Sequence, residues 1–115
     1  MPTDDTTDPF AGLFADPPAE PEFLTKLRTH DSNFADHVAA LARNAGTDGA
    51  LSVQTKTLIT LALDAADGNA SGVEDLAAVA RSQGVSEKEL AETVKVIANQ
   101  GGLGTLATAA HALEE

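Results

Sequence analysis

Residues 51–90 read LSVQTKTLITLALDAADGNASGVEDLAAVARSQGVSEKEL, and this stretch decides the fold. On both sides of a Gly-Asn pair, apolar residues recur at i, i+3, i+4 and i+7: Leu58, Leu61, Ala62 and Ala65, then Val73, Leu76, Ala77 and Ala80. This spacing gives each of two helices one apolar stripe. Gly68-Asn69 and Gly84 tolerate the positive φ angles that occur where helices end. The stretch therefore predicts two amphipathic helices joined by a turn, then a third helix start.

Two S-x-x-E patterns mark helix starts inside this stretch. They run from Ser71 to Glu74 and from Ser86 to Glu89. In a capping box, the serine hydroxyl accepts from the N3 amide and the glutamate accepts from the N-cap amide. We expect both boxes to form, so that Ser71 and Ser86 cap their helices.

The remaining helices are expected on either side of this stretch. Pro21 suits the first turn of a short helix, and Asp31 or Ser32 caps the next one. Ser52 opens a helix to about Ala66, and Gly101-Gly102 separates the last two. The apolar stripe expected for the second helix consists of Phe34, Val38, Leu41 and Ala45. No strand pattern competes, so the fold class is all-α: about six helices in an orthogonal bundle.

The N-terminal residues 1–22 differ in composition from the rest of the chain. They hold six carboxylates, all five prolines and no basic residue, which predicts a disordered acidic arm before a helical domain at 23–115. Phe10, Leu13 and Phe14 form an apolar patch in this arm. The patch could dock on the domain, on a sister subunit or on another protein, or it could be incidental.

Composition excludes several classes of function. With no cysteine, the chain has no disulfide, thiolate metal ligand or thiol catalyst. The net charge of −11 argues against binding nucleic acid or anionic lipid, and no apolar run is long enough to span a membrane. Without a signal peptide, we expect a cytoplasmic protein. Its acidity suits a high-salt cytoplasm, where charge repulsion is screened, or an ordinary acidic mesophilic protein.

A family resemblance rests on many sequence positions, each of which is only weakly specific on its own. G-A-L-S-x-x-T-K-T-L-I-x-L-A-L stands before the turn, A-x-x-x-G-V-S-x-x-E-L-x-E-x-V follows it, and Gly101-Gly102 precedes an alanine-rich helix. From about Phe34 onward the chain resembles the carboxymuconolactone decarboxylase family, which includes alkylhydroperoxidase D-like proteins. The resemblance implies an all-helical, usually oligomeric protein. We therefore expect self-association as a trimer, hexamer or dimer.

The redox members of that family carry C-x-x-C-x-x-x-H after a long helix, with a glutamate twelve residues before the first cysteine. In this chain the four roles fall on Thr57, Asn69, Gly72 and Leu76. None of these residues supplies a thiolate or a neutral-pH proton relay. The peroxiredoxin-type activity that the family implies is therefore contradicted by the absence of cysteine.

The remaining candidates for chemistry are few. His37 and His111 border apolar stripes, Lys56 could bind a carboxylate, and Glu74 could act as an acid or base. Each also has an ordinary structural explanation: packing for the histidines, a solvated lysine, and a capping box for Glu74. The histidines lack the spacing that places metal ligands on one helical face, so we expect no metal and no cofactor.

Three classes of function remain open. The first is a non-redox binding or scaffold module that has lost the thiol site. The second is a cysteine-free enzyme with lactone decarboxylase-like acid/base chemistry, although those enzymes keep a histidine where Leu76 stands. The third is a subunit of a larger complex, with Phe10, Leu13 and Phe14 as the connector. A packed hinge around Leu76 would favour the first class, and a cleft lined by a histidine and Lys56 would favour the second.

Overall fold

The computed structural model describes residues 20–114. Within this range all of the regular secondary structure is helical, and short loops connect the helices. The predicted all-α class is therefore confirmed. Residues 1–19, with the apolar patch of Phe10, Leu13 and Phe14, lie outside the described range. In chain order the elements are α2 (Glu22–His30), α3 (Ser32–Gly46), α4 (Val53–Ala66), α5 (Ala70–Ser82), α6 (Glu87–Ala109) and the 3₁₀ helix η1 (Ala110–Ala112).

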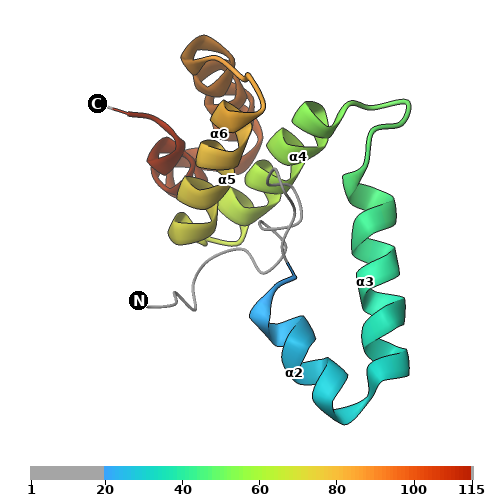
Figure 1. The fold of residues 1–115 in the computed structure, drawn as a ribbon. Helices are drawn as coiled ribbons and strands as arrows, with labels where there is room; N and C mark the ends of the chain where they lie inside the picture. Colours follow the sequence, from blue (N-terminus) through green and yellow to red (C-terminus); the bar gives the residue numbers. More distant parts are fainter. Residues whose placement is uncertain (1–19, 115) are drawn as a thin grey trace.

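The main bundle is formed by α4, α5, α6 and η1 (Figure 1). Its core contains the stripes predicted on both sides of the turn: Leu61, Val73, Leu76 and Leu90 are fully buried, together with several alanines. Alanine allows helix backbones to approach closely, so a core with few bulky side chains can still be well packed. The apolar stripes of residues 51–90 thus build the centre of this bundle.

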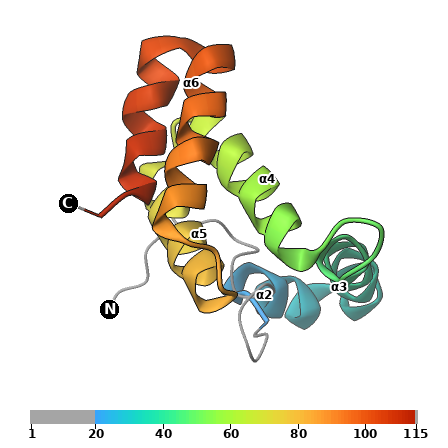
Figure 2. The ribbon, with the colours of Figure 1, turned by 90° about the horizontal axis from the view of Figure 1, so that it is seen from above.

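The helix α6 is broken near its middle. Gly102 has φ 83° and ψ −174°, outside the helical region, and Figure 2 shows the chain reversing there so that the two halves run side by side. Only glycine adopts this φ without strain. Counting the two halves, the structure has six α-helical segments among the described residues, and the predicted break at Gly101-Gly102 is where the chain turns.

The pair α2 and α3 forms a separate helical hairpin that extends away from the main bundle (Figure 1). Its own small core holds Leu24, Ala35 and Ala39. Asp31 caps α3 by accepting from the Phe34 amide at 3.0 Å, as one of the two predicted alternatives. Arg28 of α2 joins Asp36 of α3, and its other terminal nitrogen donates to Glu20 at 3.0 Å.

The predicted core stripe of α3 is the main error in the packing. Phe34 is 50% exposed and Leu41 is 71% exposed, and Ala45 is exposed too. Of the predicted stripe only Val38 is partly buried, where it packs with Ala35 and Ala39 in the hairpin core. Helical periodicity identifies a helix and its apolar side, but the element packed against that side is set by tertiary structure. The two largest apolar side chains of α3, Phe34 and Leu41, therefore face outward.

Candidate functional site

The turn between α4 and α5 holds Asn69 and Gly72, two residues that the family resemblance assigns to the cysteine positions of the redox motif. Gly68 has φ 77°, and the Asn69 amide donates to the Asp64 carbonyl at 2.9 Å. The Asn69 side chain then accepts from the Gly72 amide at 3.0 Å, so that Asn69 is the N-cap of α5. The predicted Ser71–Glu74 capping box is therefore wrong. The box requires glutamate at N3, and with Asn69 as the cap, N3 is Gly72.

Three of the four residues that the family resemblance assigns to the redox motif are buried. Thr57 is fully buried, and its hydroxyl donates to the Val53 carbonyl at 2.9 Å within its own helix. Leu76 is fully buried in the main core, and Gly72 is buried at the first turn of α5. The hydroxyl of Thr57 is thus engaged in a backbone bond, and Leu76 has only carbon atoms to offer.

A buried carboxylate fills the space beside the Cα of Gly72. A β-carbon built on Gly72 would lie 2.4 Å from Asp64 Oδ2 and 2.6 Å from Asn69 Nδ2, closer than real β-carbon contacts come. Asp64 is only 9% exposed. The turn is therefore closed by the side chains of Asp64 and Asn69, which pack over the bare Cα of Gly72.

Sequence reasoning overlooked Asp64. The available signal was a single carboxylate in the otherwise apolar run from Leu61 to Ala66, at a position that follows the buried Leu61 by three residues and Thr57 by seven. This spacing puts Asp64 on the core side of α4. An acidic residue on the buried side of a helix is uncommon and indicates a specific local environment.

Two of the four residues proposed for chemistry meet. His111 Nδ1 lies 2.9 Å from Glu74 Oε2, which joins η1 to α5 across 37 residues of sequence. Both side chains are about half exposed, at 47% and 57%. The capping role assigned to Glu74 is thus replaced by this carboxylate–imidazole pair. A carboxylate within hydrogen-bond distance of one ring nitrogen orients an imidazole.

The other two candidates are placed elsewhere. Lys56 Nζ donates to the Thr47 carbonyl at 2.6 Å, which ties the first turn of α4 to the end of α3. His37 is exposed on α3, in the outward-facing stripe between Phe34 and Leu41. Neither residue shares a hydrogen bond with the His111–Glu74 pair.

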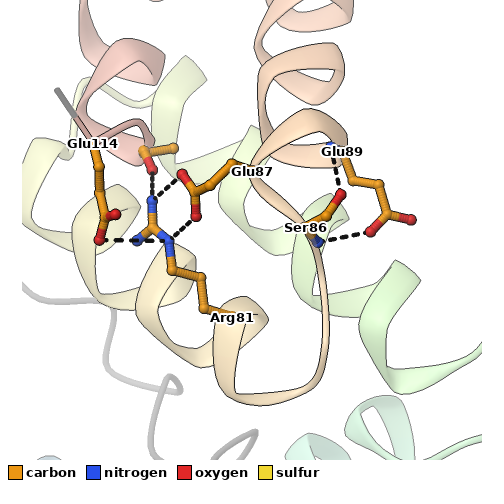
Figure 3. Close-up of polar contacts among 6 residues, drawn as sticks. Arg81, Ser86, Glu87, Glu89 and Glu114 are labelled. Carbon is orange, nitrogen blue, oxygen red and sulfur yellow. Dashed lines mark hydrogen bonds and ion pairs between the residues drawn. The ribbon is translucent and has the colours of Figure 1, made fainter.

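A cluster around Arg81 ties the C-terminal segment to the bundle (Figure 3). Arg81 Nη2 donates to Glu87 Oε1 at 2.9 Å and to the Ala112 carbonyl at 2.7 Å, and Arg81 Nε lies 3.8 Å from Glu114. The hydrogen bond from Arg81 lowers the pKa of Glu87 and raises that of Arg81. Beside it, Ser86 and Glu89 form the predicted capping box, with bonds of 3.1 and 2.8 Å (Figure 3). The cluster connects α5, α6 and η1.

Residues 20–114 contain neither a metal-ligand cluster nor a helix suited to a membrane. No group of three or more His, Cys, Asp or Glu side chains in this range is arranged to hold a metal ion. No helix in the same range combines the length and apolar character needed to cross a bilayer.

Comparison with known proteins adds one match. The model of the carboxymuconolactone decarboxylase family matches residues 32–115, which is more than half of the chain. No curated protein and no solved structure matches. The match covers α3 to the C-terminus, including the turn at Asn69 and the break at Gly102. The chain therefore belongs to the carboxymuconolactone decarboxylase family.

Proposed function

We propose that this family member is a non-redox binding or scaffold module. The observation that carries the proposal is the packing of the turn, where Leu76 is fully buried and Asp64 occupies the space beside Gly72. A peroxidatic thiol needs an accessible, electropositive position at a helix N-terminus. Here a carboxylate of low exposure takes that position. The chain keeps the helical frame of the family and uses the former site for packing.

Turnover assays test this proposal directly. The full-length protein is incubated with hydrogen peroxide and a dithiol reductant, and separately with a carboxymuconolactone substrate. We expect rates equal to those of the uncatalysed controls. Turnover that falls when a single side chain of the protein is replaced would overturn the proposal.

A cysteine-free acid/base enzyme is the second candidate, and the His111–Glu74 pair favours it. An imidazole held 2.9 Å from a carboxylate resembles the base-and-orienter arrangement used in proton transfer. His111→Gln and Glu74→Gln distinguish the candidates, because the enzyme hypothesis requires both to reduce lactone turnover. His37→Gln is the matched control, since His37 lies on α3 away from this pair.

The proposed module is also expected to bind other protein chains, either copies of itself or different proteins. We propose that it self-assembles as a dimer, trimer or hexamer, and that as part of a larger complex it would use Phe10, Leu13 and Phe14 as the connector. Eight large apolar side chains that are 37–83% exposed support self-assembly. We place the protein in a cytoplasm of high ionic strength on the basis of its charge of −11. Light scattering at micromolar concentration should give a mass above that of one chain, and a monomer would refute self-assembly.

A further inference from the structure

We propose that residues 110–114 form a strap that covers one side of α5 and opens locally while the rest of the main bundle stays folded. The strap consists of the 3₁₀ helix η1 and the two residues that follow it. It packs against α5 and against α6. Such an opening goes beyond the proposed function, because it is a movement built into the fold and would occur in a binding module and in an enzyme alike.

Two polar anchors join the strap to α5. At one anchor, His111 Nδ1 lies 2.9 Å from Glu74 Oε2. At the other, Arg81 Nη2 donates to the Ala112 carbonyl at 2.7 Å, and Arg81 Nε lies 3.8 Å from Glu114 Oε2 (Figure 3). Glu74 and Arg81 are seven residues apart, so they lie on the same side of α5 and are separated by two helical turns. The strap therefore runs along this side of α5.

Small apolar residues fill the space between the two anchors. Ala77 follows Glu74 by three residues on the same side of α5, and it is fully buried. Ala112 of the strap is 1% exposed and belongs to the same core cluster as Ala77. The side chains of Glu74 and Arg81, which flank Ala77 along the helix, are 57% and 26% exposed. The strap is therefore part of what separates Ala77 from solvent.

The apolar part of this contact is small. A buried alanine contributes one methyl group, whereas each buried leucine or valine of the main core contributes several carbon atoms. Leu113, the one large apolar residue of the strap, is 37% exposed. The anchoring ion pairs involve side chains that are partly exposed, and exposed ion pairs stabilise a fold only modestly. Segments with few buried apolar contacts are those that open before the rest of a fold. The strap therefore opens at a lower free energy than the helices beneath it.

Single cysteine substitutions measure the opening, because the chain has no cysteine of its own. Ala112→Cys places a thiol on the strap and Ala65→Cys places one on α4, and both alanines are 1% exposed. The reaction of each thiol with a soluble aromatic disulfide is followed in urea below the unfolding transition. We expect the Ala112→Cys protein to react roughly tenfold faster or more. Its rate should change little with urea, because a local opening exposes little surface, whereas the rate for Ala65→Cys should rise steeply.

Further variants test the covered side of α5 and the anchors. Ala77 lies beneath the strap, so the thiol of Ala77→Cys should react with the same shallow dependence on urea as that of Ala112→Cys. Arg81→Gln removes the charged anchor and should raise the Ala112→Cys rate about tenfold, because hydrogen bonds from charged donors are among the stronger ones. Arg43→Gln is the matched control: it removes the same charge at an exposed position of α3 and should leave the rate unchanged.

Each contrary result overturns a stated part of the proposal. If Ala112→Cys matches Ala65→Cys in rate and in urea dependence, the strap opens only with the whole fold and the proposal is wrong. Labelling of Ala77→Cys as slow as that of Ala65→Cys refutes the cover over α5, and a rate unaffected by Arg81→Gln refutes the anchor. Hydrogen exchange repeats the first comparison without a substitution, since the Leu113 amide, which bonds a carbonyl within the strap at 3.0 Å, should exchange faster than amides in the middle of α4.

Discussion

Replacing Gly72 by alanine measures how tightly the turn between α4 and α5 is packed. The new β-carbon would lie 2.4 Å from Asp64 Oδ2, 2.6 Å from Asn69 Nδ2 and 2.9 Å from Asn69 Cγ. Overpacking a closed site costs about 1–3 kcal/mol. Displacing the Asn69 cap costs about 0.5–2 kcal/mol. The higher helix propensity of alanine returns up to about 1 kcal/mol. We expect a net destabilisation of about 1–3 kcal/mol, and therefore a Tm lower by roughly 5–20 °C.

Urea and thermal unfolding followed by circular dichroism are suitable assays, because the chain has no Trp or Tyr for fluorescence. Gly104→Ala is the matched control: it lies in α6 with no atom within 4 Å of its added β-carbon, so it should be neutral or stabilise by up to about 1 kcal/mol. Asn69→Ala should cost about 1 kcal/mol alone and less in the Gly72→Ala background, because one of the two clashing side chains is then gone. If Gly72→Ala equals or exceeds the unmodified protein in stability, the closed-turn account is wrong.

Three further predictions concern charge and the former thiol site. Arg81 lowers the pKa of Glu87 below 4.5, so the pair contributes stability above pH 4.5 that is lost as the pH falls through the lower folded-state pKa. The Tm difference between the unmodified protein and Glu87→Gln should therefore be present at pH 7 and shrink below pH 4.5, and a difference that stays unchanged below pH 4.5 would contradict this. Tm should rise between dilute buffer and molar KCl, because salt screens the excess of 18 acidic over 7 basic residues, and an unchanged or lower Tm would contradict this. Asn69→Cys with Gly72→Cys should form an intramolecular disulfide faster when Asp64→Ala is added, as followed by thiol titration; equal rates would mean that Asp64 does not obstruct residue 72.

Sequence reasoning succeeded where the relevant interactions are local. The capping box from Ser86 to Glu89 spans three residues, and the helix from Val53 to Ala66 begins after the expected Ser52 cap. The break at Gly102 could be predicted because glycine is the residue type that tolerates a positive φ of this size. Each of these features depends on the backbone preferences and hydrogen bonds of residues close in the chain.

The failures concern a choice between two neighbouring N-caps and contacts between residues far apart in the sequence. Ser71 and Asn69 are both good N-caps, and Asn69 is used where its amide bonds the Asp64 carbonyl and its side chain packs beside Gly72. The 37-residue separation of Glu74 and His111 left no pattern that could pair them. Helical periodicity predicts an apolar stripe on α3 but carries no information about which element covers it. It therefore could not show that Phe34 and Leu41 face outward. These features became visible only with the tertiary arrangement.

The proposed function rests on Leu76 being part of the packed core, and Leu76→Ala tests this most directly. Leu76 is fully buried, so its truncation should reduce the free energy of unfolding by about 2–5 kcal/mol. Leu76→Met, which conserves the volume, should cost less than about 1.5 kcal/mol. Urea unfolding of the three proteins under identical conditions gives both values. A loss of less than about 1 kcal/mol for Leu76→Ala would mean that residue 76 lines an open cleft, and the account of a packed, non-redox turn would be contradicted.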